Sequence, residues 1–75
     1  MDKVSVTLFY NDSFPKKHKM SNEEAVDLIQ TIKEEVQEFI IKEETYKTKD
    51  LSSISFSDVD YNGEVQSIAI PLKER

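Results

Sequence analysis

Apolar and polar positions alternate with a period of two near the start of the chain. Every second side chain from Val4 to Tyr10 is apolar, the pattern of a half-buried strand. Residues 11–13 (Asn-Asp-Ser) have turn chemistry, so residues 14–20 are predicted to return as a second strand. Pro15 and the lysines that follow it place this second strand at a sheet edge.

After residue 20, the apolar residues recur with the period of an α-helix. Ser21 and Glu24 fit a capping box, and Met20 and Ala25 have the spacing of a hydrophobic staple. Apolar residues then recur at helical spacing for more than four turns, at Ala25, Leu28, Ile29, Ile32, Val36, Phe39 and Ile40. No glycine or proline interrupts them, so the sequence predicts one helix over residues 22–44 and a connector over residues 46–50.

The last third of the chain is typical of a hairpin around Asn62-Gly63. A two-residue turn would pair Phe56 with Ala69 and mix the two faces of the hairpin. A three-residue loop over residues 61–63 instead pairs Phe56 with Ile68 and Ile54 with Ile70, which keeps the apolar side chains on one face. We therefore predict strands over residues 52–60 and 65–71, joined by a three-residue loop with Gly63 left-handed in a bulge.

These elements predict a single α+β domain over residues 1–75, with order β-β-α-β-β and one helix packed on a four-stranded mixed sheet. The lysine-bearing and serine-rich strands are expected at the edges, which gives the strand order 2-1-4-3 with the first and last strands parallel. This element order resembles the β-grasp topology. The alternative is β-α-β-β with a three-stranded sheet. The predicted sheet side of the core is Val4, Val6, Leu8, Ile54, Phe56, Ile68 and Ile70.

The composition excludes several classes of protein. The chain has no cysteine and one histidine, which excludes disulfide frameworks, cysteine-ligated zinc, iron–sulfur clusters and thiol nucleophiles. Its longest apolar runs span three residues, far from the roughly 20 of a membrane span, and its start lacks a signal-peptide pattern. We expect a cytoplasmic protein that is not an enzyme, needs no cofactor and makes no membrane contact.

One stretch resembles the opening of a calcium-binding loop. Asp58, Asp60 and Asn62 alternate before Gly63 as in the D-x-[DN]-x-[DN]-G pattern. The position that should supply a bidentate glutamate is Ala69, and the stretch lies in a hairpin rather than between helices. An acidic hairpin tip is the better interpretation, and these three residues are only a weak calcium candidate.

The charges are unevenly distributed. The only basic cluster is residues 16–19 (Lys-Lys-His-Lys), which is typical of edge-strand protection and, less often, of a phosphate contact. The net charge of −5 argues against direct nucleic-acid binding. The predicted helix carries eight acids against two lysines, and we single out Glu34, Glu35 and Glu38 as a docking face for a basic partner. A merely solvated acidic face is the alternative.

The outer face of the predicted sheet has no charged residue on its central strands, although 33% of the chain is charged. On this face Phe9, Val59 and Val65 are candidate contact residues for a partner or a dimer; an ordinary serine- and threonine-bearing surface is the alternative.

Two functions follow from these surfaces. The first is a small acidic protein-binding module, an inhibitor or regulator that docks a basic protein surface as a nucleic-acid mimic does. In size and charge such a chain is similar to small inhibitors from phages and mobile elements. The second is an accessory domain that self-associates through the sheet face as a homodimer.

Overall fold

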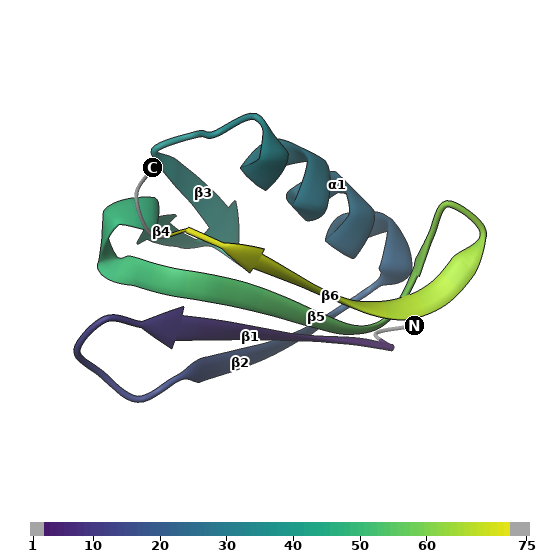
Figure 1. Cartoon of the computed structure of the whole chain (residues 1–75), viewed down its shortest axis with the longest axis horizontal. Helices are drawn as coiled ribbons and strands as arrows, with labels where there is room; N and C mark the ends of the chain where they lie inside the picture. Colours follow the sequence, from purple (N-terminus) through teal and green to yellow (C-terminus); the bar gives the residue numbers. More distant parts are fainter. Residues whose placement is uncertain (1–2, 73–75) are drawn as a thin grey trace.

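The computed structural model describes residues 3–72 and contains one α-helix beside two antiparallel sheets (Figure 1). A four-stranded sheet has the order β2-β1-β5-β6, and β3 pairs with β4 in a separate two-stranded sheet. The elements are β1 (Val4–Tyr10), β2 (Lys16–Met20), α1 (Asn22–Lys33), β3 (Glu38–Ile41), β4 (Glu44–Lys47), the 3₁₀ turn η1 (Thr48–Asp50), β5 (Leu51–Tyr61) and β6 (Glu64–Pro71). Both α1 and the β3–β4 hairpin lie on one side of the large sheet. The α+β class predicted from the sequence is confirmed.

The helix begins where the sequence predicts it. The Ser21 hydroxyl accepts a hydrogen bond from the Glu24 backbone N–H at 3.2 Å, and the Glu24 carboxylate accepts one from the Ser21 N–H at 3.2 Å. Met20 and Ala25 are both buried beside this turn. The capping box is confirmed because all of its contacts are local in the sequence.

The predicted helix end at residue 44 is wrong, because α1 stops at Lys33. Glu35 then adopts a left-handed conformation with φ 58°, and its N–H donates to the Ile32 carbonyl at 3.0 Å, a helix ending usually made by glycine. Beyond it the burial alternates: Phe39 and Ile41 are buried, whereas Ile40 is 67% exposed. This period of two belongs to a strand, which β-branched and aromatic residues favour.

The predicted connector over residues 46–50 is also wrong, because it contains β4 and η1. The β3–β4 hairpin closes through a two-residue turn in which Lys42 and Glu43 both have positive φ, 48° and 74°. Positive φ at both central residues is the usual geometry of a two-residue hairpin turn, and asparagine and glycine are the residues that normally adopt it. Neither residue occurs here, so the sequence does not indicate a turn at this position.

The predicted order 2-1-4-3 is wrong, as is the three-stranded alternative: β5, not β6, lies beside β1, and every pair among the described strands is antiparallel. The serines of β5 suggested an edge strand, but they lie on its outer face. Its inner face buries Leu51, Ile54, Phe56 and Val59, whereas β6 buries only Ile70. The strand with more buried side chains takes the central position.

The β5–β6 register confirms the predicted pairs Phe56–Ile68 and Ile54–Ile70. The predicted three-residue loop is wrong: Tyr61 pairs with Glu64 around a two-residue turn, with Gly63 left-handed at φ 80°. The extra residue lies inside the strand, where Ser57 and Asp58 together oppose Ser67 and Asp58 has φ 62°. The predicted bulge is therefore present but displaced from the turn.

This displaced bulge reverses the predicted direction of one contact residue. Ser57 and Asp58 form the bulge directly before Val59. The extra residue shifts the alternation of side chains by one position, so Val59 points inward and is fully buried. The prediction of Val59 on the outer face is wrong, since each extra residue exchanges the two faces of the strand beyond it.

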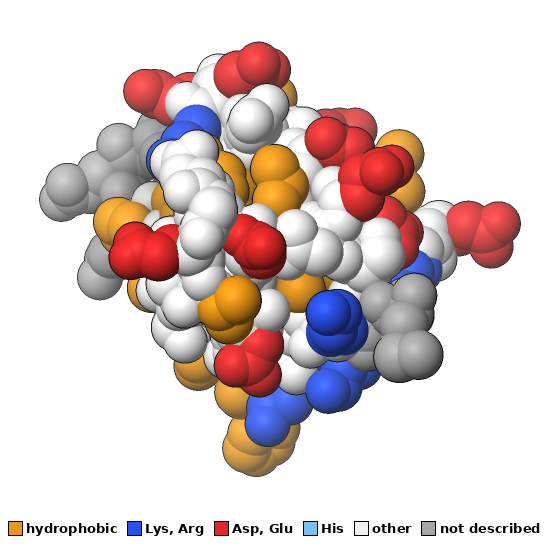
Figure 2. All heavy atoms as spheres, turned by 90° about the vertical axis from the view of Figure 1, so that its right-hand side faces the viewer, with side chains coloured by type: hydrophobic (Ala, Val, Ile, Leu, Met, Phe, Trp, Pro, Cys, Tyr) orange, Lys and Arg blue, Asp and Glu red, His pale blue; other side chains and the backbone are white. Residues whose placement is uncertain are grey.

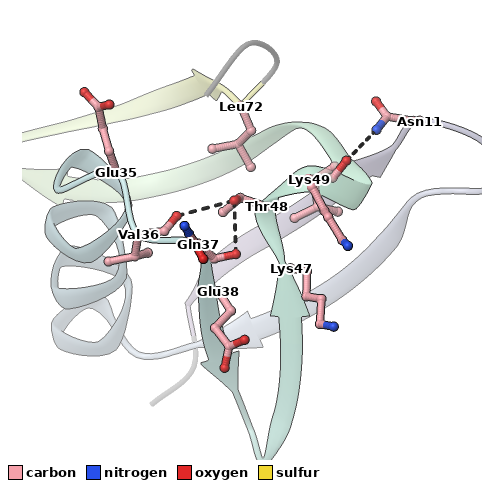
Figure 3. Close-up of a pocket in the computed structure, with 10 residues that line it drawn as sticks. Asn11, Glu35, Val36, Gln37, Glu38, Lys47, Thr48, Lys49 and Leu72 are labelled. Carbon is pink, nitrogen blue, oxygen red and sulfur yellow. Dashed lines mark hydrogen bonds between the residues drawn. The ribbon is translucent and has the colours of Figure 1, made fainter.

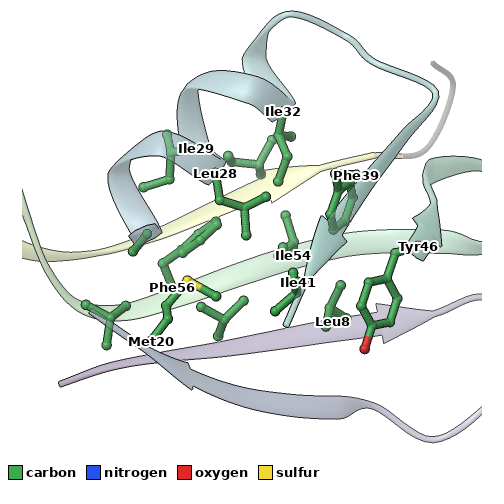
Figure 4. Packing of buried hydrophobic residues seen from close by; sticks show 14 of the residues in the cluster. Leu8, Met20, Leu28, Ile29, Ile32, Phe39, Ile41, Tyr46, Ile54 and Phe56 are labelled. Carbon is green, nitrogen blue, oxygen red and sulfur yellow. The ribbon is translucent and has the colours of Figure 1, made fainter. Parts of the chain in front are cut away.

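The core lies between the inner face of the large sheet, α1 and the small hairpin (Figure 4). Phe56 and Leu8 of the sheet belong to this core with Ile29 and Ile32 of α1, and Phe39 and Tyr46 close one end with their ring centroids 5.8 Å apart. All the predicted sheet residues are buried except Ile68, which is half-buried. Of the predicted helical stripe, Val36 is half-buried and Ile40 exposed.

Candidate functional site

Among residues 3–72, no helix or hairpin covers the outer face of the large sheet (Figure 1). Residues from neighbouring strands meet on it in rows, as the strand pairings give them: Ser5 beside Ser57, Thr7 beside Ser55 and Ala69, and Phe9 beside Ser53 and Pro71. Within residues 3–72, no charged side chain stands on β1 or on the part of β5 before the bulge on this side. The uncharged face that the sequence indicated is thus confirmed up to the bulge, whereas beyond it Asp60 pairs with Val65 and brings a carboxylate to this side.

The composition of this face changes from one sheet edge to the other. On β2, Lys17 and Lys19 stand beside Thr7 and Ser5. The two central strands present hydroxyl groups together with Phe9, which is 39% exposed. On β6 the outward side chains are small or apolar, and Val65 is 70% exposed. Phe9 and Val65 therefore lie on the outer face as the sequence predicts.

The three glutamates predicted as one helical face do not share a face. Glu34 caps the helix, Glu35 lies in the loop after it, and Glu38 begins β3. Figure 3 shows the carboxylates of Glu35 and Glu38 pointing in different directions. Their placement on a continuous helix is wrong because α1 stops before them.

Glu35 and Glu38 instead border a hollow of about 790 Å³ between the loop after α1 and η1 (Figure 3). Lys47 and Lys49 border it too, so its rim is of mixed charge rather than acidic. The Thr48 hydroxyl, which is buried, donates to the Gln37 carbonyl at 3.1 Å. This bond holds the wall of the hollow in place.

A different set of acids gathers where α1 begins and β5 turns into β6. The Asn22 side chain bonds the backbone of Asp60 there, which brings the first helical turn beside the hairpin. Figure 2 views this end of the molecule, where acidic side chains are spread over the upper and middle parts and most of the lysines lie toward the lower edge. The exposed acids of these two segments, here called the acidic end, are Glu23, Glu24, Asp58, Asp60 and Glu64.

The weak calcium candidates lie along this hairpin rather than around a loop. Asp58 is in the bulge, Asp60 pairs with Val65 across the ladder, and Asn62 is in the two-residue turn. Among the described residues, no three histidine, cysteine, aspartate or glutamate side chains come close enough together to hold a metal ion.

A cluster of titratable groups that the sequence did not reveal joins β2 to the small hairpin. Lys16 Nζ lies 2.6 Å from Glu44 Oε2, and His18 Nε2 lies 2.6 Å from the Tyr46 hydroxyl. The Tyr46 hydroxyl also donates to Glu44 Oε1 at 3.4 Å. No sequence pattern connects these residues, because their meeting depends on where β4 docks.

The electrostatics of this cluster follow from its contacts. The bond to Glu44 raises the pKa of Lys16, and the same bond lowers the pKa of Glu44. Burial lowers the pKa of His18 and raises the pKa of Tyr46. A neutral imidazole and a neutral phenol therefore face each other beside an exposed ion pair, an arrangement that fastens the hairpin to β2.

None of the helices in residues 3–72 has the length and apolarity needed to cross a membrane. Comparisons of the chain with protein-family models, with curated proteins and with solved structures find no match.

Proposed function

We propose that this chain is a small protein-binding module whose contact surface is the outer face of the four-stranded sheet. One observation carries the proposal: the outer sides of β1 and of β5 up to its bulge lack charge in a chain of which 33% is charged. A flat surface of hydroxyl groups with an exposed aromatic ring suits a protein partner, because short side chains lose little conformational entropy on contact.

The chemistry of the face indicates the kind of partner. Phe9 offers an apolar anchor, and its neighbours across the rows, Ser53 and Pro71, are small or compact. Lys17 and Lys19 flank the hydroxyl groups on one side. We infer a partner with a shallow apolar depression for Phe9 and acidic groups beside it, since opposite charges at the rim speed association.

The test compares two variants of equal charge change. T7K/S55K places two ammonium groups on the central strands of the face, and Q30K/T45K places two on exposed positions of α1 and β4. We expect the first variant to bind the proteins captured by the wild-type chain at least about tenfold more weakly. The second variant should bind them with unchanged affinity. Equal capture by both variants would refute the proposal, provided that circular dichroism shows both folded.

Docking of a basic partner is a second candidate function, favoured by the acidic end. The bond between Asn22 and Asp60 joins the acids of two segments into one surface. In this case E23K/E64K, not T7K/S55K, would abolish capture. Binding would also weaken steeply as salt approaches about 0.5 M, where the Debye length is roughly 4 Å.

A further inference from the structure

The two edges of the large sheet differ in how they are protected. β2 forms one edge with five residues, three of them lysines, and it follows Pro15. Charged side chains and proline are the usual means by which an edge strand avoids pairing with another strand.

The opposite edge, β6, has these devices only at its two ends, Glu64 and Pro71. It is eight residues long, and no charged residue occurs between Glu64 and its last residue, Pro71. Among the described strands β6 pairs only with β5, and the bulge of this pair lies on β5, so β6 itself has no extra residue. Its outer edge thus offers an unprotected row of backbone donors and acceptors.

Elsewhere in the sheet, a side chain covers a stretch of backbone that has no strand partner on one side. β5 extends beyond the last residue of β1 that pairs with it, Ser5 opposite Ser57, and there the Asn22 side chain bonds both backbone groups of Asp60. Within residues 3–72, β6 is the long edge strand whose middle, residues 65–70, has neither a charged side chain nor such a cap.

We infer that β6 pairs antiparallel with β6 of a second copy of this chain, about a two-fold axis at Ser67, to give an eight-stranded sheet. The sequence of β6 between Glu64 and Pro71 favours a second copy as the occupant. It carries no charge there, so two chains of net charge −5 can meet with most of their acids away from the seam. A two-fold axis also lets each copy use the same strand.

The side chains of β6 match each other in this register. The axis places Ser67 opposite Ser67 and Val65 of each copy opposite Ala69 of the other. Both pairs lie on the outer face, and the pairing covers Val65, which is 70% exposed. Because the seam is one strand of eight residues, about 27 Å long, the interface is small. We expect a dissociation constant on the order of 100 µM.

Sedimentation of the full chain from about 20 µM to about 2 mM tests the inference. S67K/A69K brings four ammonium groups to the seam, whereas T7K/S55K adds the same charge to the same face on β1 and β5. We expect the wild type and T7K/S55K to dimerise with similar constants and S67K/A69K to stay monomeric. In the wild type, amide-exchange protection in β6 should rise with concentration.

Two results would overturn the inference. One is a wild-type chain that remains monomeric at about 2 mM, well above the expected constant. The other is a dimer that S67K/A69K leaves intact and T7K/S55K abolishes, because the copies would then meet face to face. Edge pairing leaves the outer face of each copy open, so the first result does not bear on partner capture, whereas the second would show that the outer face binds a second copy.

Discussion

The side chain of Asn22 pairs with the backbone of Asp60 as a neighbouring strand would. Its amide donates to the Asp60 carbonyl at 3.0 Å and accepts from the Asp60 N–H at 2.6 Å. No residue of β1 is paired with β5 at this point, because their ladder ends at Ser57. The first residue of α1 therefore completes the sheet and sets the position of the helix against the end of β5.

Removal of this amide is expected to destabilise the fold. N22A leaves both backbone groups of Asp60 without their partner and should lower the free energy of unfolding by about 1–2 kcal/mol in urea titrations. N22D keeps only an acceptor and should fall between N22A and the wild type. Q30A, at an exposed site on the same helix, is the control and should change little. A loss of equal size in Q30A would contradict the role given to Asn22.

Glycine at strained turn positions is expected to stabilise the protein. Glu35 and Glu43 have positive φ, 58° and 74°, which costs most residues about 1 kcal/mol that glycine does not lose. E35G and E43G should each raise the free energy of unfolding by roughly 0.5–1 kcal/mol in thermal or urea titrations.

The neighbouring Glu34 has φ −81°, so E34G is the matched control and should destabilise through the greater entropy of the unfolded chain. The reverse change, G63A, meets no atom within 4 Å of the new methyl group. Its cost should therefore come from the backbone conformation alone. Stabilisation by E34G as large as by E35G would contradict this explanation.

The Thr48 hydroxyl holds the loop after α1 to η1. It donates to the Gln37 carbonyl at 3.1 Å and lies 3.4 Å from the Val36 carbonyl. T48V removes the donor at nearly constant volume and should cost about 1–2 kcal/mol in urea titrations, while T48S should keep most of the stability. Amide exchange of residues 36–38 should accelerate in T48V only; an unchanged exchange rate would show that the hydroxyl does not hold the loop.

Protonation of His18 is expected to weaken the fold. Burial lowers the pKa of His18 below 6.5, and Lys16 and Lys42 lower it further while Glu44 opposes them. The unfolded chain therefore binds a proton more readily than the folded one. The stability from the neutral imidazole is fully present above pH 6.5, and it is lost as the pH falls through the lowered folded pKa.

Unfolding titrations between about pH 7.5 and 5.5 test this expectation. The free energy of unfolding of the wild type should decrease as the pH is lowered across this range. H18Q should show a smaller slope, because His18 is the only histidine in the chain. An equal slope in H18Q would show that another group carries the dependence.

Several features were determined by the sequence alone, and all of them are local. The start of α1 follows from the capping box, and β1 follows from alternation over seven residues. The pairing of Phe56 with Ile68 follows from the need to keep apolar side chains on one face. In each case the residues that decide the structure are close in sequence or lie in one hairpin.

The chemistry of the outer face could also be predicted, but not the position of every residue on it. Phe9 stands on a regular strand, so its direction follows from alternation. Val59 follows the bulge at Ser57 and Asp58 and turns inward. A bulge adjusts the register to the packing on both sides of it, and the local pattern does not reveal where the extra residue lies.

Only the tertiary structure decided the end of the helix, the strand order and the cluster around His18. Residues 36–41 fit helical spacing, yet Phe39 and Ile41 are buried as alternate residues of a strand. β5 became central because its inner side chains fill the space under α1, which no count of its serines could show. These outcomes depend on competition for one core among segments distant in sequence, and local propensity is weaker than the burial it opposes.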